Sequence, residues 1–432
     1  MHIKIDHIAK IEGHAGFTAD IAEGNVQKAR IDVQEGARLL EGILRDRSIF
    51  EVSQITSRIC GVCPVVHTLT SLKALEKALN IEVSEQTILL RKLTMMGQII
   101  NSHALHLFFF SLSDFFGTAN DLDLIKKFPG RAKDALALRE FGNKIIEIIG
   151  GRSIHPLTPT IGGFLKLPDA KKLGKIFYEC EEILGAAKKL AALFIKLKYP
   201  AFIRSAPYAS LHHAKEYAIY DGLIKTPDEK NTSPTEFIDT IKEFQLKGSA
   251  VKRAQYLGKP FMVGAISRLN NNPGQLNPEA KKYLRAAKIH LPSFNPFHNI
   301  LAQAIEMVHC VEEAKKLLHN ILRQDLSKNN SGEHERLIKT KLRLIQISAR
   351  GTAAMEAPRG TLYYFYEIGG NGKVKNCNII TPTSQNLARV EKDLEEYLPS
   401  LLGTKNVCKK DCTDKIKMLV RAYDPCLTCA TH

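Results

Sequence analysis

The sequence is poor in cysteine, with nine among 432 residues. Small secreted domains are dense in disulfides, and nine unevenly placed cysteines in a chain of this length do not form such a scaffold. Four of the nine fall into two C-x-x-C pairs, Cys60 with Cys63 and Cys426 with Cys429. This usage favours metal ligation or redox chemistry.

Long apolar runs are also missing. The longest aromatic-rich apolar stretch, residues 104–112, is much shorter than the roughly 20 residues that cross a bilayer as a helix. Residues 1–8 alternate apolar and polar positions, unlike the charged and then apolar segments of a signal peptide. We therefore expect a cytoplasmic protein without a direct membrane span.

Negative charge is scarce relative to positive charge: 61 Lys and Arg stand against 45 Asp and Glu, a net charge of +16. Such an excess suits nucleic acids, anionic membranes or acidic partners. The basic residues, however, alternate with apolar ones at helical spacing, as in 188–198 and 339–343. No zinc-finger, helix-turn-helix or RNA-binding signature accompanies them. The pattern is typical of solvated helix faces, and we expect no nucleic-acid partner.

Apolar periodicity predicts a mainly α-helical chain with small peripheral β-sheets, an α+β fold in which a bundle of long helices encloses a metal site. Residues 1–35 alternate like a short antiparallel sheet with a turn at 23–25. From residue 36 the period becomes helical, and Ser84 is a plausible N-cap for a long helix towards Leu112.

Two breaks are expected within the helical part: a Gly/Pro-rich turn system at 150–163, and an extended segment with a loop at 261–273. Glycine-rich residues 369–372 predict a hairpin, and helices are expected at 384–400 and 411–423. Without repeats or linkers, residues 1–432 form a single unit. Its parts are an N-terminal β region (1–35), a helical core (36–345) and a C-terminal hairpin and helical region (346–432).

Two C-x-x-C pairs often hold a structural zinc ion. Zinc ribbons usually join their pairs over a short loop, whereas here almost the whole chain separates Cys63 from Cys426. A histidine also follows each pair, His67 after the first and His432 after the second. These features disfavour a structural zinc site.

The surroundings of both pairs resemble the signatures of nickel-iron hydrogenase large subunits. Arg58-Ile59-Cys60-Gly61-Val62-Cys63 precedes His67, and Asp424-Pro425-Cys426 leads to Cys429 and His432. Other landmarks of that family follow in order along essentially the whole chain: Ile11-Glu12-Gly13-His14, Ser102-His103-Ala104-Leu105-His106, Glu356-Ala357-Pro358-Arg359-Gly360 and Pro382-Thr383. The resemblance implies the catalytic subunit of a nickel-iron hydrogenase, which cleaves H2 heterolytically and reversibly into protons and electrons.

The resemblance also implies a ligand set. Cys60 and Cys426 would be terminal nickel thiolates, and Cys63 and Cys429 would bridge nickel to an iron that carries one carbon monoxide and two cyanides. Soft thiolates suit such metals. His67 would hydrogen-bond a bridging sulfur. The pocket for the diatomic ligands would be lined by Val62, Ala357, Pro358, Pro382 and Thr383, with the Thr383 hydroxyl facing a cyanide.

Heterolytic cleavage of H2 requires a metal and a nearby base. By resemblance, Arg359 overhangs the vacant metal position, Cys426 receives the proton and Glu12 relays it outward, while Asp424 pairs with Arg359. Without the motif, Arg359 would be interpreted as a surface ion-pair residue and Glu12 as a turn residue before Gly13.

A second, hard cation, Mg²⁺ or Fe²⁺, is implied near the C-terminus, with Glu41, His432 and the backbone carbonyl of Ile379 as ligands. In this family an extension is removed after the corresponding histidine, so we expect either a processed chain or a gene without the extension. Ser102 stands where many membrane-associated periplasmic relatives carry aspartate. This serine resembles the cytoplasmic multi-subunit branch, such as archaeal sulfhydrogenases and the viologen-reducing enzymes of methanogens.

No further cysteine cluster is present, so we expect no iron-sulfur cluster in this chain and an obligate iron-sulfur small subunit as electron partner. Further electron-transfer subunits would bind NAD(P), a deazaflavin or ferredoxin. His103 and His106 are expected to pack, and five single cysteines are assigned to no metal: Cys180, Cys310, Cys377, Cys408 and Cys412. The alternatives are a metal-lacking, hydrogenase-like structural subunit of a respiratory-type complex and a basic binding protein with a structural zinc.

Overall fold

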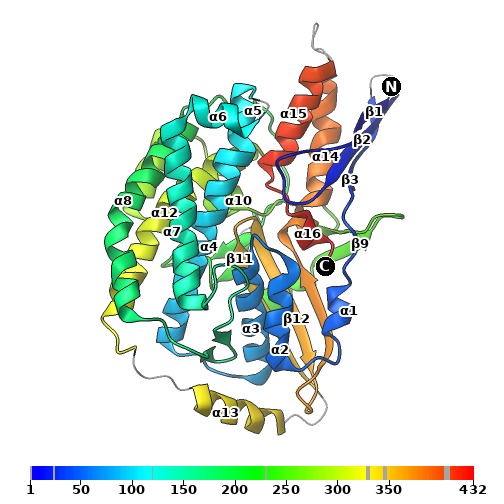
Figure 1. The fold of residues 1–432 in the computed structure, drawn as a ribbon. Coiled ribbons are helices and arrows are strands. Elements are labelled where there is room, and N and C mark those ends of the chain that lie inside the picture. Colours follow the sequence, from blue (N-terminus) through cyan, green and yellow to red (C-terminus); the bar gives the residue numbers. More distant parts are fainter. Residues whose placement is uncertain are drawn as a thin grey trace.

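The structure is a computed structural model that describes residues 2–22, 25–118, 120–228, 231–326, 331–343, 348–402 and 409–432. The chain is mainly helical, and its strands form small, separate antiparallel sheets, which confirms the predicted fold class. Figure 1 shows long helices on one side of the molecule and, on the other, a three-stranded sheet surrounded by the N-terminal and C-terminal elements.

Four long helices form the first part: α4 (Glu85–Ala104), α7 (Pro129–Gly150), α8 (Ala170–Ile195) and α12 (His298–Leu322). The Ser84 hydroxyl accepts a hydrogen bond from the N–H of Thr87, which confirms the predicted N-cap of α4. Helices α4 and α7 cross at Gly97 and Gly142, where a Cβ on Gly142 would lie 2.4 Å from the Gly97 carbonyl oxygen. Only glycine permits so close an approach.

Helix α4 continues through a π-helical segment (Leu105–Ser111) into α5 (Leu112–Phe116), so the predicted long helix does reach Leu112. The predicted turn system after α7 contains the small hairpin β4 (Pro159–Thr160) and β5 (Gly163–Phe164). Shorter helical elements complete the periphery: α6 (Asp121–Lys127), η3 (Pro273–Gln275), α11 (Pro278–Ala287) and α13 (Ser331–Arg343).

The central sheet consists of β11 (Ala349–Ala357), β12 (Gly360–Ile368) and β13 (Val374–Ile380) in antiparallel order. The predicted hairpin is confirmed, since residues 369–372 join β12 to β13. At the opposite end, only Pro358 and Arg359 separate β11 from β12. That tight turn carries Arg359 into the interior, where its side chain is buried.

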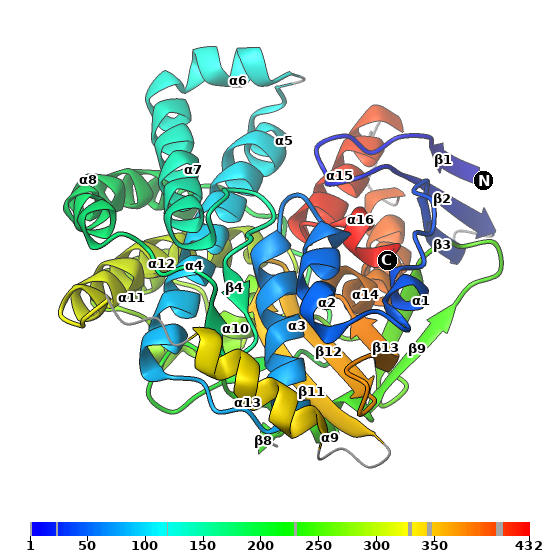
Figure 2. The ribbon, with the colours of Figure 1, turned by 60° about the horizontal axis from the view of Figure 1, so that its bottom comes forward.

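Helix α3 (Pro64–Leu79) packs on β11 and β12, and Figure 2 shows α2 (Ile49–Thr56) and α3 in front of the sheet. Successive tyrosines of β12 point to opposite faces of the sheet. Tyr364 and Tyr366 join the main core, and Tyr363 joins a smaller core on the far face. A Cβ on Gly351 would lie 2.2 Å from the Ala74 carbonyl oxygen, so α3 lies directly on the strand.

The N-terminal sheet contains β1 (His2–Ile5), β2 (Ala15–Ala22) and β3 (Asn25–Val33), all antiparallel, as the alternation of residues 1–35 predicts. The predicted turn at 23–25 falls mostly on residues 23 and 24, which lie outside the described residues. Strand β3 packs on α14 (Pro382–Leu402). The first and last parts of the chain therefore lie side by side (Figure 1).

The stretch 201–271 departs from the predicted helices. It contains β6 (Ser210–His212), β7 (Leu223–Lys225), β8 (Asn231–Thr232), α9 (Pro234–Ile238), β9 (Ile241–Gln245), β10 (Lys252–Tyr256) and α10 (Ala265–Asn271). The extended conformation expected from residue 261 is wrong for α10, which is helical. Its seven residues span only about two turns, and its polar side chains Ser267, Arg268 and Asn271 are buried together with the apolar ones, so too few positions repeat to reveal a helical period.

The C-terminal helices expected at 384–400 and 411–423 are confirmed as α14 and α15 (Lys409–Ala422), which pack together. After α15 the chain turns inward and ends in α16 (Leu427–Ala430). On the N-terminal side, α1 (Leu40–Leu44) and η1 (Ser57–Ile59) flank α2.

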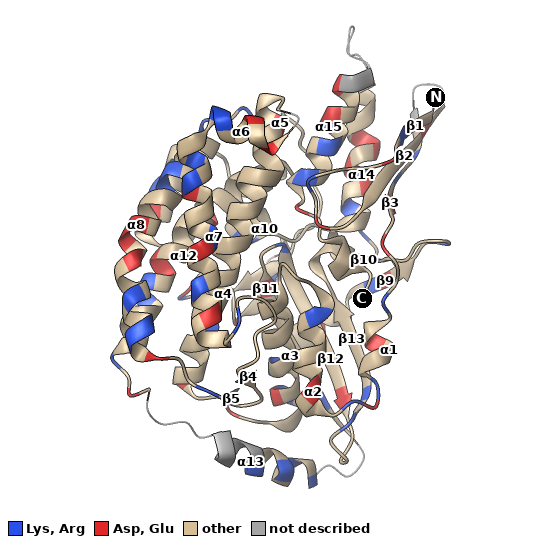
Figure 3. Cartoon of the chain, in the orientation of Figure 1, with Lys and Arg blue, Asp and Glu red and all other residues tan. Residues whose placement is uncertain are grey.

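Among the described residues, no helix combines the length and apolarity needed to cross a bilayer. Figure 3 shows Lys and Arg interleaved with Asp and Glu along α7 and α8, as expected of solvated faces.

Candidate active site

The four paired cysteines meet in the interior. The sulfurs of Cys60 and Cys426 are 3.4 Å apart, those of Cys63 and Cys429 are 3.3 Å apart, and all four lie within 4.8 Å of one another. Within the described ranges, no other group of three or more His, Cys, Asp or Glu side chains has the geometry of a metal site. Cys180, Cys310, Cys377 and Cys412 are buried single thiols, and Cys408 lies outside the described residues.

The first pair is held by the start of α3. Cys63 is the N-cap residue, Pro64 opens the helix, and the N–H groups of Val62 and Cys63 point at the Cys60 sulfur at 3.2 and 3.4 Å. The N–H groups of Val65 and Val66, in the first turn of α3, donate to the side-chain oxygen of Gln98 on α4, at 2.7 and 3.3 Å. The helix N-terminus favours negative charge, which suits thiolates.

The second pair is held by distant parts of the chain. Cys426 forms a parallel bridge with Glu12, and its N–H donates to the Thr383 hydroxyl at 2.9 Å. One Glu12 oxygen, Oε2, lies 3.0 Å from the Cys426 sulfur. The other, Oε1, accepts a hydrogen bond of 2.6 Å from the Thr428 hydroxyl. The Glu12 carboxylate is therefore oriented against the sulfur.

The thiols differ in acidity. A hydrogen bond from Cys426 holds the pKa of Cys60 well below its usual range, whereas burial raises the pKa of Cys426 and of Cys429 well above it. A buried cluster of four sulfurs that loses further protons needs a cation to balance the charge. The donor set therefore fits soft metal ions.

Arg359 lies beside the sulfurs. Its Nε donates to the backbone oxygen of Asp424 at 2.7 Å, and its Nη2 lies 2.9 Å from the Asp424 carboxylate, with both side chains buried. Burial opposes the charge of Arg359, but Asp424 and the nearby thiolates outweigh it and raise the arginine pKa well above its usual range. Nη1 of Arg359 is buried and has no hydrogen-bond partner among the described residues, so it remains available to a ligand of the site.

Asp424 is fixed in turn by a side chain that the sequence motifs do not reveal. Gln303 on α12 donates to the Asp424 carboxylate at 3.1 Å, and its oxygen lies 2.5 Å from Nδ1 of His106. His103 pairs with Glu306 at 2.9 Å. Both histidines are buried, as predicted, and each also bonds to α12. The hydroxyl of Ser102, the residue before His103, is buried and has no hydrogen-bond partner among the described residues.

His67 links the first pair to the second. Its Nδ1 lies 2.7 Å from the Tyr364 hydroxyl and its Nε2 lies 3.5 Å from the Cys429 sulfur. Burial lowers the pKa of His67 to about 3, so the ring is neutral and carries one proton. Burial also raises the pKa of Tyr364, which therefore keeps its proton. When the Tyr364 hydroxyl donates to Nδ1, the histidine proton is on Nε2 and faces the sulfur.

A small cavity of about 10 Å³ lies against three of the four sulfurs. It is lined by Cys63, His67, Ala357, Pro358, Arg359, Leu362, Pro382, Thr383, Cys426 and Cys429. These include four of the five expected pocket residues. The fifth, Val62, lies half-buried in the cysteine loop, and Leu362 is an addition. A structural zinc site is closed by its four ligands, so open space beside the sulfurs and a buried arginine favours a catalytic metal centre.

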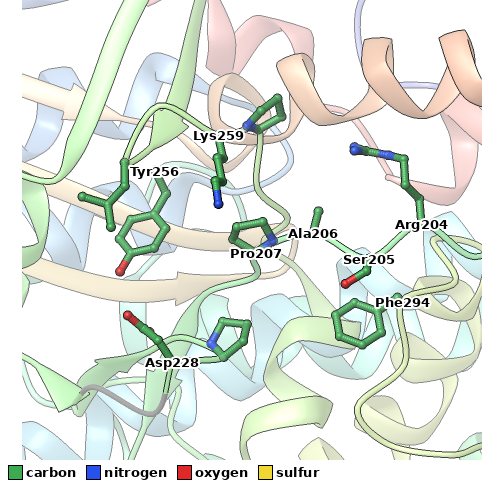
Figure 4. Close-up of a pocket in the computed structure, with 11 residues that line it drawn as sticks. Arg204, Ser205, Ala206, Pro207, Asp228, Tyr256, Lys259 and Phe294 are labelled. Atoms are coloured by element: carbon green, nitrogen blue, oxygen red, sulfur yellow. The ribbon is translucent and has the colours of Figure 1, made fainter.

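A larger cavity, about 560 Å³, lies elsewhere and shares no residue with this one. Figure 4 shows Tyr256, Lys259 and Pro207 on one side and Phe294 and Arg204 on the other. No cysteine or histidine lines it. Cavity size alone therefore does not mark the reaction centre.

The three expected hard-cation ligands also come together. Nε2 of His432 lies 2.7 Å from the Ile379 oxygen and 3.7 Å from the Glu41 carboxylate. Burial raises the pKa of Glu41, but His432 and Lys252 outweigh it and lower the value to about 2, so the carboxylate stays charged. The Lys252 ammonium lies 2.9 Å from Glu41, and Glu243 lies 3.7 Å from that ammonium. The Glu41 carboxylate, the Ile379 carbonyl and the His432 imidazole are oxygen and nitrogen donors that suit a divalent cation.

Similarity to known proteins agrees with this geometry. A solved NAD⁺-reducing [NiFe]-hydrogenase superposes with a TM-score of 0.88 at 25% identity, covering 100% of this chain and 99% of that one. The alpha subunit of sulfhydrogenase 1 from Pyrococcus furiosus is 35% identical over 100% of this chain and 97% of its own length. The alpha subunit of sulfhydrogenase 2 from the same organism is 32% identical over 100% and 99%.

The fold and the four-cysteine site thus define a nickel-iron hydrogenase large subunit. The sequence model of the nickel-dependent hydrogenases matches residues 38–127 and 203–432, and the chain belongs to this family. It is an oxidoreductase that acts on H2.

Proposed function

We propose that Cys60, Cys63, Cys426 and Cys429 hold the nickel-iron centre at which this catalytic subunit cleaves H2 reversibly. The observation that carries the proposal is the open cavity beside four converging sulfurs, bordered by a buried arginine. Cys60 and Cys426 would hold the nickel, and Cys63 and Cys429 would hold the iron as well.

The cavity suits an iron that carries one carbon monoxide and two cyanides. Its walls are apolar at Ala357, Pro358, Leu362 and Pro382, and the Thr383 hydroxyl and the Arg359 guanidinium are its polar groups besides the sulfurs and His67. Small polar ligands in an apolar pocket are oriented by a few donors of this kind.

When bound, the nickel-iron centre supplies the site at which H2 is polarised and its two electrons are taken up. The chain supplies the path of a proton. Cys426 Sγ holds it first, and Glu12 Oε2, 3.0 Å away, receives it. The Thr428 hydroxyl fixes the other Glu12 oxygen, so the accepting oxygen keeps its orientation. Arg359 provides a fixed positive charge against the centre, held by Asp424.

His67 donates to the Cys429 sulfur and so withdraws electron density from a bridging thiolate, as outer hydrogen bonds do at metal sites. We assign Mg²⁺ or Fe²⁺ to Glu41, His432 and the Ile379 carbonyl. Such a cation would tie α1, the end of β13 and the C-terminal residues together.

Electrons must leave through another protein, and we propose an iron-sulfur small subunit as obligate partner. Several large apolar side chains are exposed: Leu39 at the start of α1, Ile43 on α1, Phe50 on α2, and Ile154 and Leu157 before β4. Figure 2 shows α1, α2 and β4 on the side of the molecule that faces the viewer. Exposed apolar surface, where it is contiguous, marks protein interfaces. Further subunits that bind NAD(P), a deazaflavin or ferredoxin would continue the electron path.

We also assign the chain to the cytoplasmic multi-subunit branch. Ser102 and the 35% identity to a sulfhydrogenase alpha subunit support this assignment.

The direct test is analysis of the purified complex. We expect about one nickel per chain, infrared bands of cyanide and carbon monoxide, and loss of H2 uptake in Cys426→Ala. Cys310→Ala, which removes a buried single thiol, is the matched control and should retain nickel. A pure, folded complex without nickel would overturn the proposal and favour a structural homologue that has lost the metal.

A further inference from the structure

Arg38 lies in the irregular segment between β3 and α1 and bridges the two halves of the metal site. Its Nη1 donates to the Arg58 carbonyl oxygen at 3.4 Å, and its Nη2 donates to the Ile59 oxygen at 2.7 Å. Nη2 also donates to the carbonyl oxygen of Thr428. The guanidinium thus contacts the residues directly before Cys60 and a residue between Cys426 and Cys429.

The backbone of Arg38 strengthens the link, because its N–H donates to the Thr431 oxygen at 2.8 Å. Other contacts of the site hold one pair each: Gln98 the first, Glu12 and Thr383 the second. Apart from the sulfurs and His67, Arg38 is the only one of the described residues whose hydrogen bonds reach both segments.

The chemistry of the contact explains why an arginine is needed. Backbone carbonyl oxygens of the two segments point at one place, where they repel one another unless a cation lies between them. A guanidinium presents several N–H groups in a fixed plane and can serve three carbonyls at once, whereas an ammonium is a point charge with rotating donors. The half-buried position strengthens these hydrogen bonds relative to water-exposed ones.

We propose that Arg38 is a positioning residue that fixes the separation of the two cysteine pairs and so sets the arrangement of the four sulfurs. The inference rests on the proposed metal-binding role of those cysteines. Arg38 donates to backbone carbonyls and to none of the sulfurs, and therefore acts through the backbone that carries the cysteines.

The test compares the purified complex of the wild type with Arg38→Ala, Arg38→Gln and Arg38→Lys. Arg45→Ala is the matched control, since the exposed Arg45 follows α1 and donates to Asn376. Nickel is measured over time during dialysis against a chelator, alongside the melting temperature and the infrared bands of the iron ligands. We expect nickel loss about 10- to 100-fold faster in Arg38→Ala and Arg38→Gln, in the range for supporting groups of metal sites.

Arg38→Lys should be intermediate, because an ammonium cannot bridge all three carbonyls. The infrared bands should shift or broaden in the Arg38 variants and stay unchanged in Arg45→Ala, a result that a general loss of stability would not produce. Wild-type kinetics of nickel loss and wild-type bands in Arg38→Ala overturn the positioning role. If Arg38→Ala does not fold, the same result in a folded Arg38→Lys overturns it. A wild-type complex without nickel overturns the proposed function instead.

Discussion

Cys60 and Cys63 stand at the start of a 16-residue helix, whereas Cys426 is the N-cap of a helix of four residues and Cys429 lies within it. Helix α3 packs along the central sheet, and Gln98 satisfies its first N–H groups. Helix α16 has no comparable length. Its cysteines are located by Glu12, Thr383 and Arg38, which come from three distant parts of the chain.

The two cysteine pairs are therefore held in place in two different ways. The first pair is part of the folded core, so its geometry follows from the stability of α3 and the sheet. The second pair depends on a few long-range hydrogen bonds and on the Asp424–Arg359 pair. Substitutions around the second pair should therefore impair the metal chemistry with little effect on global stability, and those around the first pair should do the reverse.

The largest effect is expected for Arg359→Lys. A lysine keeps the charge, but it cannot bind the backbone oxygen and the carboxylate of Asp424 and also present a donor to the cavity. H2 uptake should therefore fall about 100- to 1000-fold, as for loss of a fixed electrostatic donor. Nickel content should stay near the wild type. Arg350→Lys, on β11 at an exposed ion pair with Glu367, is the control. Unchanged H2 uptake in Arg359→Lys would show that the guanidinium is not needed for the reaction.

The next largest effect is expected for Glu12→Gln. The amide can still accept from Thr428 but cannot take up a proton, so H2 uptake should fall about 100-fold, in the range for lost acid-base groups. Glu35→Gln is the matched control, because Glu35 accepts from the His14 N–H and touches no sulfur. Loss of nickel from Glu12→Gln would show that Glu12 holds the second pair rather than relaying protons.

Removal of nickel should affect the two cysteine pairs differently. In the metal-free complex, amide hydrogen exchange should accelerate in residues 425–431, because only distant hydrogen bonds remain to hold them. Amides within α3 should exchange as slowly as in the loaded complex. The measurement is hydrogen exchange by mass spectrometry on both forms. Equal acceleration in both segments would mean that the metal, and not the core, holds the first pair as well.

The smallest effect is expected for Gln98→Met, which keeps the side-chain volume and removes the acceptor for Val65 and Val66. Loss of a helix cap should lower the free energy of unfolding by about 1 kcal/mol, with a lower denaturation midpoint. Nickel content and H2 uptake should remain close to the wild type. A strong loss of nickel at unchanged stability would contradict the division between the pairs.

The candidate ligands could be predicted from the sequence because they stand in recognisable motifs. The paired cysteines, Arg359 and Asp424 stand in short patterns, and the helical and hairpin periods of the fold are local signals. Gln303, Tyr364, Gln98 and Arg38 could not be found this way. Each has a partner that only tertiary packing brings close, and no motif near it in the sequence marks it as part of the site.

The wrong prediction for residues 265–271 has a similar cause. The sequence predicts an extended segment where α10 forms, because a helix of seven residues spans too few turns for a helical period to be recognised. Arg268 on α10 is fully buried and bonds to the Ala357 and Pro358 oxygens. The helix therefore supports the turn that carries Arg359, which its sequence alone does not disclose.

The separation of the pairs along the chain also has a consequence in time. At typical synthesis rates of about 5–20 residues per second, the roughly 360 residues between Cys63 and Cys426 take on the order of 20–70 s to make. Throughout that interval the ribosome has delivered two thiols without their partners. The four-sulfur site is thus completed only when Cys429 has been made, and loading of its metals onto all four sulfurs has to follow that step.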